Sequence, residues 1–263
     1  MDRQGPHLSR QDTGTTGTGS VGLCCHDIDL SFEGRTVFEK FALDFEPGRW
    51  TCLLGPSGCG KSSLLRILTE TQDFCFSGSV CFSGTCKTTG LIAWMSQKDL
   101  LLPWLRVLDN IVIGARLRGE LDANSLRKAE ILLEKVGMAG CGKLYPGALS
   151  GGMRQRVALL RTLMEERPVL LMDEPFSALD ALTRFKLQNL AARLARGKTV
   201  VLVTHDPFEA LRLGHRVVVL GGSPANVVAE LRPGGAIPRT TDGPEFAQEH
   251  AALLQTLFAE EGV

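Results

Sequence analysis

The chain has 263 residues, of which 44% are hydrophobic and 22% are charged, and its 29 basic residues balance 29 acidic ones. This length and composition suit one large globular domain, since domains usually hold about 100–200 residues. The lack of a basic excess argues against a nucleic-acid partner, because such binding requires positive charge to displace counterions. No run approaches the roughly 18 apolar residues of a membrane-spanning helix, and the amino terminus lacks an apolar signal core. We therefore expect the chain to stay where it is made.

The amino-terminal part predicts a tail and then strands. Residues 1–20 are rich in Gly, Thr and Ser with few apolar side chains, which predicts a disordered tail. Short apolar stretches between residues 21 and 45, broken at Glu33–Arg35, predict a strand and hairpin. Trp50–Leu54 is a compact apolar strand, and residues 61–70 carry apolar side chains at helical spacing.

The middle and second half of the chain alternate between strand and helix patterns. Residues 74–96 are strand-like and rich in turns, residues 122–137 predict an amphipathic helix, and another helix is expected after Ser150. The elements expected beyond it are strand 169–172, helix 181–196, strand 200–204, helix 207–213 and strand 217–220. Alternating strands and helices imply a mainly parallel sheet.

The carboxyl-terminal segment predicts one more helix. Between residues 246 and 258, one helical face collects the apolar side chains Phe246, Leu253, Leu254, Leu257 and Phe258. Docking of this face onto the chain's own domain is the expectation, with a partner surface as the alternative.

Eight cysteines are present, but none forms a CxxC pair, which argues against a redox motif or a zinc ribbon. We interpret them as reduced and mostly buried small side chains. A structural metal site built from Cys75, Cys81 and Cys86 is the alternative.

A glycine-rich loop between a predicted strand and a predicted helix fits the pattern G-x-x-x-x-G-K-[ST]. Its glycines let the backbone N–H groups point at phosphate oxygens, while the helix start adds its positive dipole end. Lys61 supplies a point charge for the β- and γ-phosphates, and the hydroxyl of Ser62 suits Mg²⁺, which prefers oxygen ligands. The residues predicted to bind ATP here are Gly55, Pro56, Ser57, Gly58, Cys59, Gly60, Lys61, Ser62 and Ser63.

Two acids follow the apolar strand at residues 169–172. A buried strand that ends in carboxylates delivers them to the carboxyl edge of a sheet. We expect Asp173 to hold Mg²⁺, directly or through water, and Glu174 to polarise the attacking water as a general base.

Other motifs narrow the family, since a P-loop with a strand acid is shared by kinases, GTPases, helicases and transport ATPases. The segment Leu149–Met153 (LSGGM), which lies upstream of the acidic strand, resembles the LSGGQ signature of ABC ATPases. Ser150 also has the chemistry of a helix N-cap, beside glycines that leave room for phosphate. The resemblance runs from about residue 21 to about residue 229. It matches Gln97 to the Q-loop glutamine, Ser177–Asp180 to the D-loop, His205 to the switch histidine and Phe32 to the adenine-stacking aromatic.

This resemblance implies a composite site in a head-to-tail homodimer, or in a pair with a second ATPase subunit. The signature of one subunit, with Ser150, Gly151 and Gly152, would close over ATP on the P-loop of the other, and Asp180 would work across the interface. Gln97 would sense Mg²⁺ and the attacking water, and His205 would contact the γ-phosphate and hold the water. The catalytic set is thus Glu174, His205 and Gln97, and the metal set is Ser62, Gln97 and Asp173. For Phe32, a simple core phenylalanine is the alternative.

The implied fold is α/β: a P-loop NTPase core with a mainly parallel sheet, an N-terminal antiparallel β-lobe and a helical signature subdomain. The expected boundaries are a tail at 1–20, an ABC ATPase domain at 21–231 with the helical subdomain at about 100–163, and a carboxyl-terminal extension at 232–263. Residues 70–90 match the family poorly, which leaves the strand pairing of that lobe open.

Residues 100–104 (LLLPW), with Val107 and Asn110, resemble the importers of nitrate, sulfonates, taurine and thiamine precursors. That resemblance implies solute import through a separate membrane-spanning permease, together with an extracytoplasmic solute-binding protein. The chain would then lie peripherally on the cytoplasmic side of the inner membrane. In this family the region of Pro103 and Trp104 faces the groove for the permease's coupling helix, although a buried turn is the alternative.

Three other functions compete with this interpretation. An ABC exporter ATPase would share every motif named. A soluble ABC-type ATPase of DNA repair, chromosome maintenance or translation would usually carry coiled coils, zinc modules or tandem cassettes, which the sequence lacks. In a P-loop small-molecule kinase, Glu174 would be merely structural and the signature a coincidence.

Overall fold

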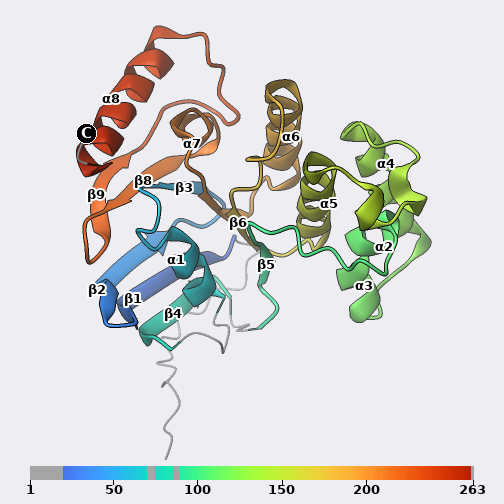
Figure 1. Cartoon of the computed structure of the whole chain (residues 1–263), viewed down its shortest axis with the longest axis horizontal. Helices are drawn as coiled ribbons and strands as arrows, with labels where there is room; N and C mark the ends of the chain where they lie inside the picture. The colour runs from blue at the N-terminus through green and yellow to red at the C-terminus, as the bar shows by residue number, and fades with distance from the viewer. Residues whose placement is uncertain (1–19, 70–74, 86–88, 262–263) are drawn as a thin grey trace, which may run out of the picture.

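The computed structural model of the chain describes residues 20–69, 75–85 and 89–261, which form two sheets with helices packed around them (Figure 1). A three-stranded antiparallel sheet has the order β2-β1-β4, and a six-stranded sheet has the order β5-β6-β7-β3-β8-β9. The strands are β1 Gly22–Phe32, β2 Arg35–Phe45, β3 Trp50–Leu54, β4 Ser77–Ser83, β5 Ile92–Met95, β6 Val169–Asp173, β7 Thr199–Val203, β8 Arg216–Gly221 and β9 Asn226–Leu231.

The helices flank both sheets and build one end of the molecule (Figure 1). They are α1 Lys61–Leu68, α2 Val107–Ile111, α3 Ile113–Leu117, α4 Ala123–Lys135, α5 Gly151–Met164, α6 Ala181–Leu194, α7 Pro207–Leu213 and α8 Pro244–Glu261, with short 3-10 turns at Cys141–Lys143 and Pro146–Ala148. Of the described helices, none is long and apolar enough to cross a membrane.

The six-stranded sheet is mainly parallel, as the alternating pattern predicted. Strands β5, β6, β7, β3 and β8 are paired in parallel, and β9 joins β8 antiparallel at one edge. Strands β3, β6 and β7 are buried along their whole length, which explains their continuous apolar sequence. Strand β9 was not predicted from the sequence, because its side chains are mostly exposed and give only a weak apolar pattern.

The hairpin between β1 and β2 turns at Glu33 and Gly34, whose φ angles are both positive, at 48° and 84°. Two-residue turns of this kind match the twist of antiparallel strands, and they favour glycine because positive φ strains other residues. The expected break at Glu33–Arg35 is therefore confirmed. Strand β4 pairs antiparallel with β1, which resolves the pairing that the sequence left open.

Two apolar cores lie on opposite faces of the parallel sheet. In β3, Leu53 packs into the core shared with the β-lobe and α1, while Cys52 and Leu54 pack into the core on the other face. Because α1 is held between the β-lobe and the parallel sheet, the loop that joins β3 to α1 has a fixed position.

The helical end shares a core with the parallel sheet. Val157 of α5 and Ala129 of α4 belong to the same buried cluster as Met172 of β6. The expected boundaries at about residues 100 and 163 stay a prediction, since one core spans them. The expected tail at residues 1–20 lies outside the described residues apart from Ser20.

Helix α8 docks onto its own domain, at the end of the molecule opposite α2–α4 (Figure 1). Phe246 and Leu253 are buried, and the Phe246 ring meets Phe208 of α7 edge to face with centroids 5.1 Å apart. Phe258, however, is half exposed, because the buried stripe continues through Leu257 instead.

The expectation that all the cysteines are reduced was wrong. Cys24 and Cys81 form a disulfide between β1 and β4, with their Cα atoms 5.2 Å apart, so the cysteines are not all reduced. The alternative of a metal site built from Cys75, Cys81 and Cys86 is not tested, since Cys86 lies outside the described residues; Cys75 is free and exposed, and Cys81 is paired with Cys24. Sequence spacing missed the pair because strand pairing brings together residues 57 positions apart.

Candidate nucleotide site

The loop between β3 and α1 has a backbone that only glycine fits at two positions. Gly55 has φ +145°, and a Cβ atom there would lie 2.2 Å from the carbonyl oxygen of Leu220. Gly60 has φ +102°, and its Cβ would lie 2.8 Å from Cζ of Phe38 on β2. Both the angles and the space exclude a side chain, so the loop keeps its backbone open toward a ligand at the helix start.

Lys61 opens α1 with its ammonium group turned back over this loop. Its Nζ donates to the carbonyl oxygens of Gly55 and Pro56, at 2.6 and 2.7 Å. The side chain is largely buried, so the positive charge is held at the loop instead of extending into solvent. A loop of backbone amides with a fixed cation is a site for phosphate oxygens.

Ser62 and Asp173 meet where α1 faces the end of β6. The two side chains are hydrogen-bonded, and Asp173 is only 5% exposed. Burial raises the pKa of Asp173, and the negative charge of Glu174 adds to the rise, although the bond from Ser62 acts in the opposite direction. Oxygen ligands and neighbouring carboxylates are the donor set that Mg²⁺ prefers, so the residues present fit that ion.

The side chain of Glu174 contacts side chains from two other loops, those of Gln97 and His205. Gln97 follows β5, Glu174 follows β6 and His205 follows β7, and these three strands are neighbours in the sheet. The Oε2 atom of Glu174 accepts a hydrogen bond from Nε2 of Gln97 at 3.3 Å and lies 3.5 Å from Nδ1 of His205. The structure thus brings the three expected catalytic side chains together at the carboxyl edge of the sheet.

Gln155 is a further site residue, to which the sequence analysis gave no role. It is 7% exposed on α5, and its Nε2 donates to the backbone oxygen of Glu174 at 2.9 Å and to Oγ of Ser177 at 3.1 Å. Its Oε1 accepts from the backbone N–H of Ala178 at 2.9 Å. A polar residue one helical turn after Gly151 was the available signal, but the contacts come from a distant part of the chain.

The signature residues form the start of α5. Ser150 is the N-cap and accepts from the backbone N–H of Met153 at 3.3 Å, as its sequence position predicted. Ser150 and Gly151 are exposed, whereas a Cβ at Gly152 would lie 3.0 Å from the carbonyl oxygen of Ala178. The glycines therefore serve two purposes: an open helix start at Gly151 and close packing on the D-loop at Gly152.

Asp180 and Phe32 lie at the ends of other elements. Asp180 caps α6 by accepting from the backbone N–H of Thr183 at 3.0 Å, and this bond helps to lower the pKa of its carboxyl group. Phe32 ends β1 and is 44% exposed, so it is not a simple core phenylalanine.

The segment after Gln97 presents apolar side chains to solvent. Asn110 is fully buried, and its side chain accepts from the N–H of Leu102 at 2.8 Å and donates to three backbone oxygens of the same loop. This network leaves Leu100 58% exposed and Trp104 70% exposed. The alternative of a buried turn at Pro103 and Trp104 is therefore wrong for Trp104.

Comparison with known proteins agrees with this geometry. Residues 38–177 match the family model described as ABC transporter. The chain is 45% identical over 240 residues to a Haemophilus influenzae protein described as an uncharacterized ABC transporter ATP-binding protein. This alignment covers 89% of this chain and 98% of that protein. The chain is also 42% identical over 245 residues to the aliphatic sulfonates import ATP-binding protein SsuB of Delftia acidovorans. This alignment covers 92% of this chain and 95% of that protein.

A solved structure shows the same architecture. The dimeric post-hydrolysis state of the ATP-binding cassette MJ0796, bound to ADP and Pi, aligns with a TM-score of 0.69 at 27% identity. The alignment covers 81% of this chain and 100% of the other. The chain therefore belongs to the ABC transporter family and is one of its nucleotide-binding, ATP-hydrolysing proteins.

Proposed function

We propose that this chain powers an importer of aliphatic sulfonates or closely related small anions, as a head-to-tail dimer beneath a separate membrane-spanning permease. The observation that carries the catalytic part is the contact of one Glu174 oxygen with both Gln97 and His205, beside the P-loop. The name of the Delftia relative supports the cargo class.

In the proposed reaction, water attacks the γ-phosphorus of ATP, the bond to the β-phosphate bridging oxygen breaks, and ADP and phosphate leave. The Glu174 carboxylate accepts a hydrogen bond from the water and then takes its proton. His205 and Gln97 position the Glu174 carboxylate and the water, and Lys61 neutralises phosphate charge. Ser62, Asp173 and Gln97 are the residues proposed to hold Mg²⁺, which when bound would neutralise charge that develops on the phosphates.

A second copy of the chain would complete the site. The exposure of Ser150 and Gly151 at the start of a 14-residue helix leaves a set of N–H groups available to a phosphate of another subunit. Asp180, at the start of α6, would work across the same interface. The dimeric assembly of the MJ0796 cassette supports this arrangement.

Helix α5 supports a route from the site to the permease. It begins at the signature, holds the Glu174 backbone through Gln155, and near its other end Arg161 donates to the backbone oxygens of Asp99 and Leu100, at 2.7 and 2.8 Å. Leu100 and Trp104 are exposed apolar side chains on the loop that Arg161 and Asn110 hold. An apolar anchor of this kind would pack against a permease helix, and closure of the dimer would move it as a rigid body.

This coupling places the chain peripherally at the inner membrane, on the side where ATP is present. For an importer, an extracytoplasmic solute-binding protein would deliver the cargo to the permease. Neither partner is needed for ATP binding itself, so the nucleotide site and the transport role can be tested separately.

The test is affinity capture of the tagged chain from gently solubilised native membranes, followed by mass spectrometry and reconstitution of the captured complex in liposomes. The proposal expects a permease and a solute-binding protein, and ATP-driven uptake of an aliphatic sulfonate in preference to the matching carboxylate. Trp104→Ala should lose the permease, while the control Phe258→Ala, which also removes an exposed aromatic ring, should keep it. Capture of the permease with no binding protein and with sulfonate efflux would overturn the import proposal.

A further inference from the structure

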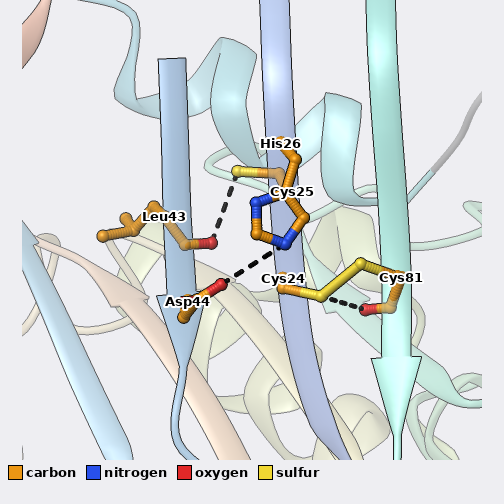
Figure 2. The surroundings of a disulfide bond; sticks show 6 residues. All are labelled: Cys24, Cys25, His26, Leu43, Asp44 and Cys81. Carbon is orange, nitrogen blue, oxygen red and sulfur yellow. Dashed lines mark hydrogen bonds and ion pairs between the residues drawn. A yellow bond between two sulfur atoms is a disulfide. The ribbon is translucent and has the colours of Figure 1, made fainter.

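A cluster of sulfur, nitrogen and oxygen ligands lies on the solvent-exposed face of the β-lobe strands, where Figure 2 shows the Cys24–Cys81 disulfide beside His26 and Asp44. Strand pairing places Asp44 of β2 opposite Cys24 of β1, and Cys24 opposite Cys81 of β4. His26 is two residues along β1, on the same face as Cys24, because side chains alternate along a strand. Three adjacent strands therefore bring four ligand-type side chains together.

The ligand atoms are close enough to share one ion. One ligand atom from each of Cys24, His26 and Cys81 lies within 4.8 Å of the others. The His26 Nε2 atom is 3.7 Å from Oδ1 of Asp44, and both of these side chains are substantially exposed. The two sulfurs are half-buried, so the cluster is open to solvent on the histidine side.

We propose that Cys24, Cys81 and His26, once the disulfide is reduced, bind a thiophilic divalent metal ion of the Zn²⁺ class. This goes beyond ATP hydrolysis but rests on the proposed function in one respect: a subunit that works on the ATP side of the membrane meets thiol reductants there. A dithiol reductant reduces the Cys24–Cys81 disulfide by thiol–disulfide exchange, which leaves two thiols on the chain and a disulfide on the reductant. The reduced Cys24 thiol can then donate to the Cys81 carbonyl oxygen, 3.3 Å away.

Metal binding releases both thiol protons, while the imidazole contributes a nitrogen lone pair. A tetrahedral Zn²⁺ with Zn–S near 2.3 Å and Zn–N near 2.0 Å holds its ligand atoms about 3.5–3.8 Å apart. The observed separations of up to 4.8 Å reach this arrangement by small side-chain rotations. Asp44 orients the imidazole ring, as carboxylates beside metal-binding histidines do, and a water molecule takes the fourth position.

The neighbouring Cys25 shows why the cluster uses Cys24. Cys25 points into the core on the opposite face, and its thiol donates to the Leu43 carbonyl oxygen at 3.6 Å (Figure 2). Because Cys25 is fully buried, its thiol cannot reach an ion that is bound on the exposed face. Two adjacent cysteines thus have different chemistry because a strand turns them to opposite faces.

The test uses the full chain, reduced with a dithiol and freed of reductant under anaerobic conditions, and titrated with Zn²⁺ against a chromophoric chelator. We expect one tight equivalent that is absent from the oxidised chain. Cys24→Ser, Cys81→Ser and His26→Ala should each weaken binding at least about 100-fold, and Asp44→Asn about 10-fold. Cys75→Ser, which removes a free exposed cysteine elsewhere, is the matched control and should leave binding unchanged.

Titration with Co²⁺ gives a second readout that does not depend on affinity. The reduced chain should develop thiolate-to-cobalt charge transfer and intense d–d absorption of a tetrahedral site, which the Cys24→Ser and Cys81→Ser variants lose. Equal Zn²⁺ binding by the reduced chain and the Cys24→Ser/Cys81→Ser double variant would overturn the proposal. Because neither readout involves ATP, that result would leave the transport proposal standing, and loss of ATP hydrolysis would leave this one standing.

Discussion

The side chain of Gln155 donates to the backbone oxygen of Glu174 at 2.9 Å, which ties the signature helix to the residue that follows the acidic strand. Glu174 has a positive φ of 48°, a conformation that a side chain such as glutamate adopts only with support from its surroundings. We interpret Gln155 as a positioning residue that supplies part of this support.

Replacement of Gln155 by glutamate should lower kcat about 10- to 100-fold and change KM for ATP little. Glutamate keeps the size and the acceptor for the Ala178 N–H, but it turns the Nε2 donor to Glu174 and Ser177 into an acceptor, which displaces the Glu174 backbone. Steady-state phosphate release measures both constants. The control is Gln248→Glu, the same change at an exposed position of α8. A raised KM for ATP with an unchanged kcat would contradict the positioning role.

Phe32→Ala should raise KM for ATP and for GTP by similar factors of roughly 10, because a stacking ring contacts any purine face. The exposure of Phe32 means that the fold should lose little stability, in contrast to truncation of the fully buried Phe38. Fluorescent-nucleotide titration and a melting curve check the two effects. Phe32→Tyr, which keeps the ring, should bind nucleotide like the wild type, and weak binding by that variant would count against stacking.

Glu209 predicts a pH-dependent contribution to stability. Burial raises the pKa of this α7 side chain from 4.5 to about 7, although hydrogen bonds from Thr204 and Gln188 act to lower it. Because the folded pKa is the higher one, this contribution is fully present below pH 4.5 and is lost as the pH rises through about 7. The free energy of unfolding that Glu209 contributes should differ by roughly 3 kcal/mol between pH values below 4.5 and pH values above about 7.

Urea unfolding of the wild type and Glu209→Gln at pH 5 and pH 8 measures this difference. The wild type should lose stability relative to Glu209→Gln as the pH rises, since glutamine stays neutral. Glu39→Gln, at an exposed position of β2, should follow the wild type. Parallel pH profiles for wild type and Glu209→Gln would exclude the assigned titration.

Sequence alone predicted the parts of the site that short segments encode. The glycine loop before Lys61 and the cap at Ser150 depend on neighbouring residues, so their patterns are visible in the sequence. The convergence of Gln97, Glu174 and His205 was expected through family resemblance and follows from the order of the strands.

The missed features depend on contacts between distant segments. Gln155 acts on a backbone 19 residues away, and Cys24 meets Cys81 only because β4 pairs with β1. Strand β9 has an apolar pattern too weak to be recognised without its partner β8. In each case the side chain has an ordinary sequence context, and tertiary structure gives it its role.

The measurement that tests the central claim most directly is phosphate release by Glu174→Gln with ATP and Mg²⁺, beside nucleotide binding by the same variant. If Glu174 is the general base of an ATP-hydrolysing dimer, binding should stay near the wild-type level, turnover should fall about 100-fold or more, and ATP should shift the variant to a dimer in sedimentation. Glu245→Gln, in the exposed first turn of α8, should hydrolyse ATP normally. Turnover by Glu174→Gln within about 2-fold of the wild type would contradict the assignment of Glu174 as the catalytic base.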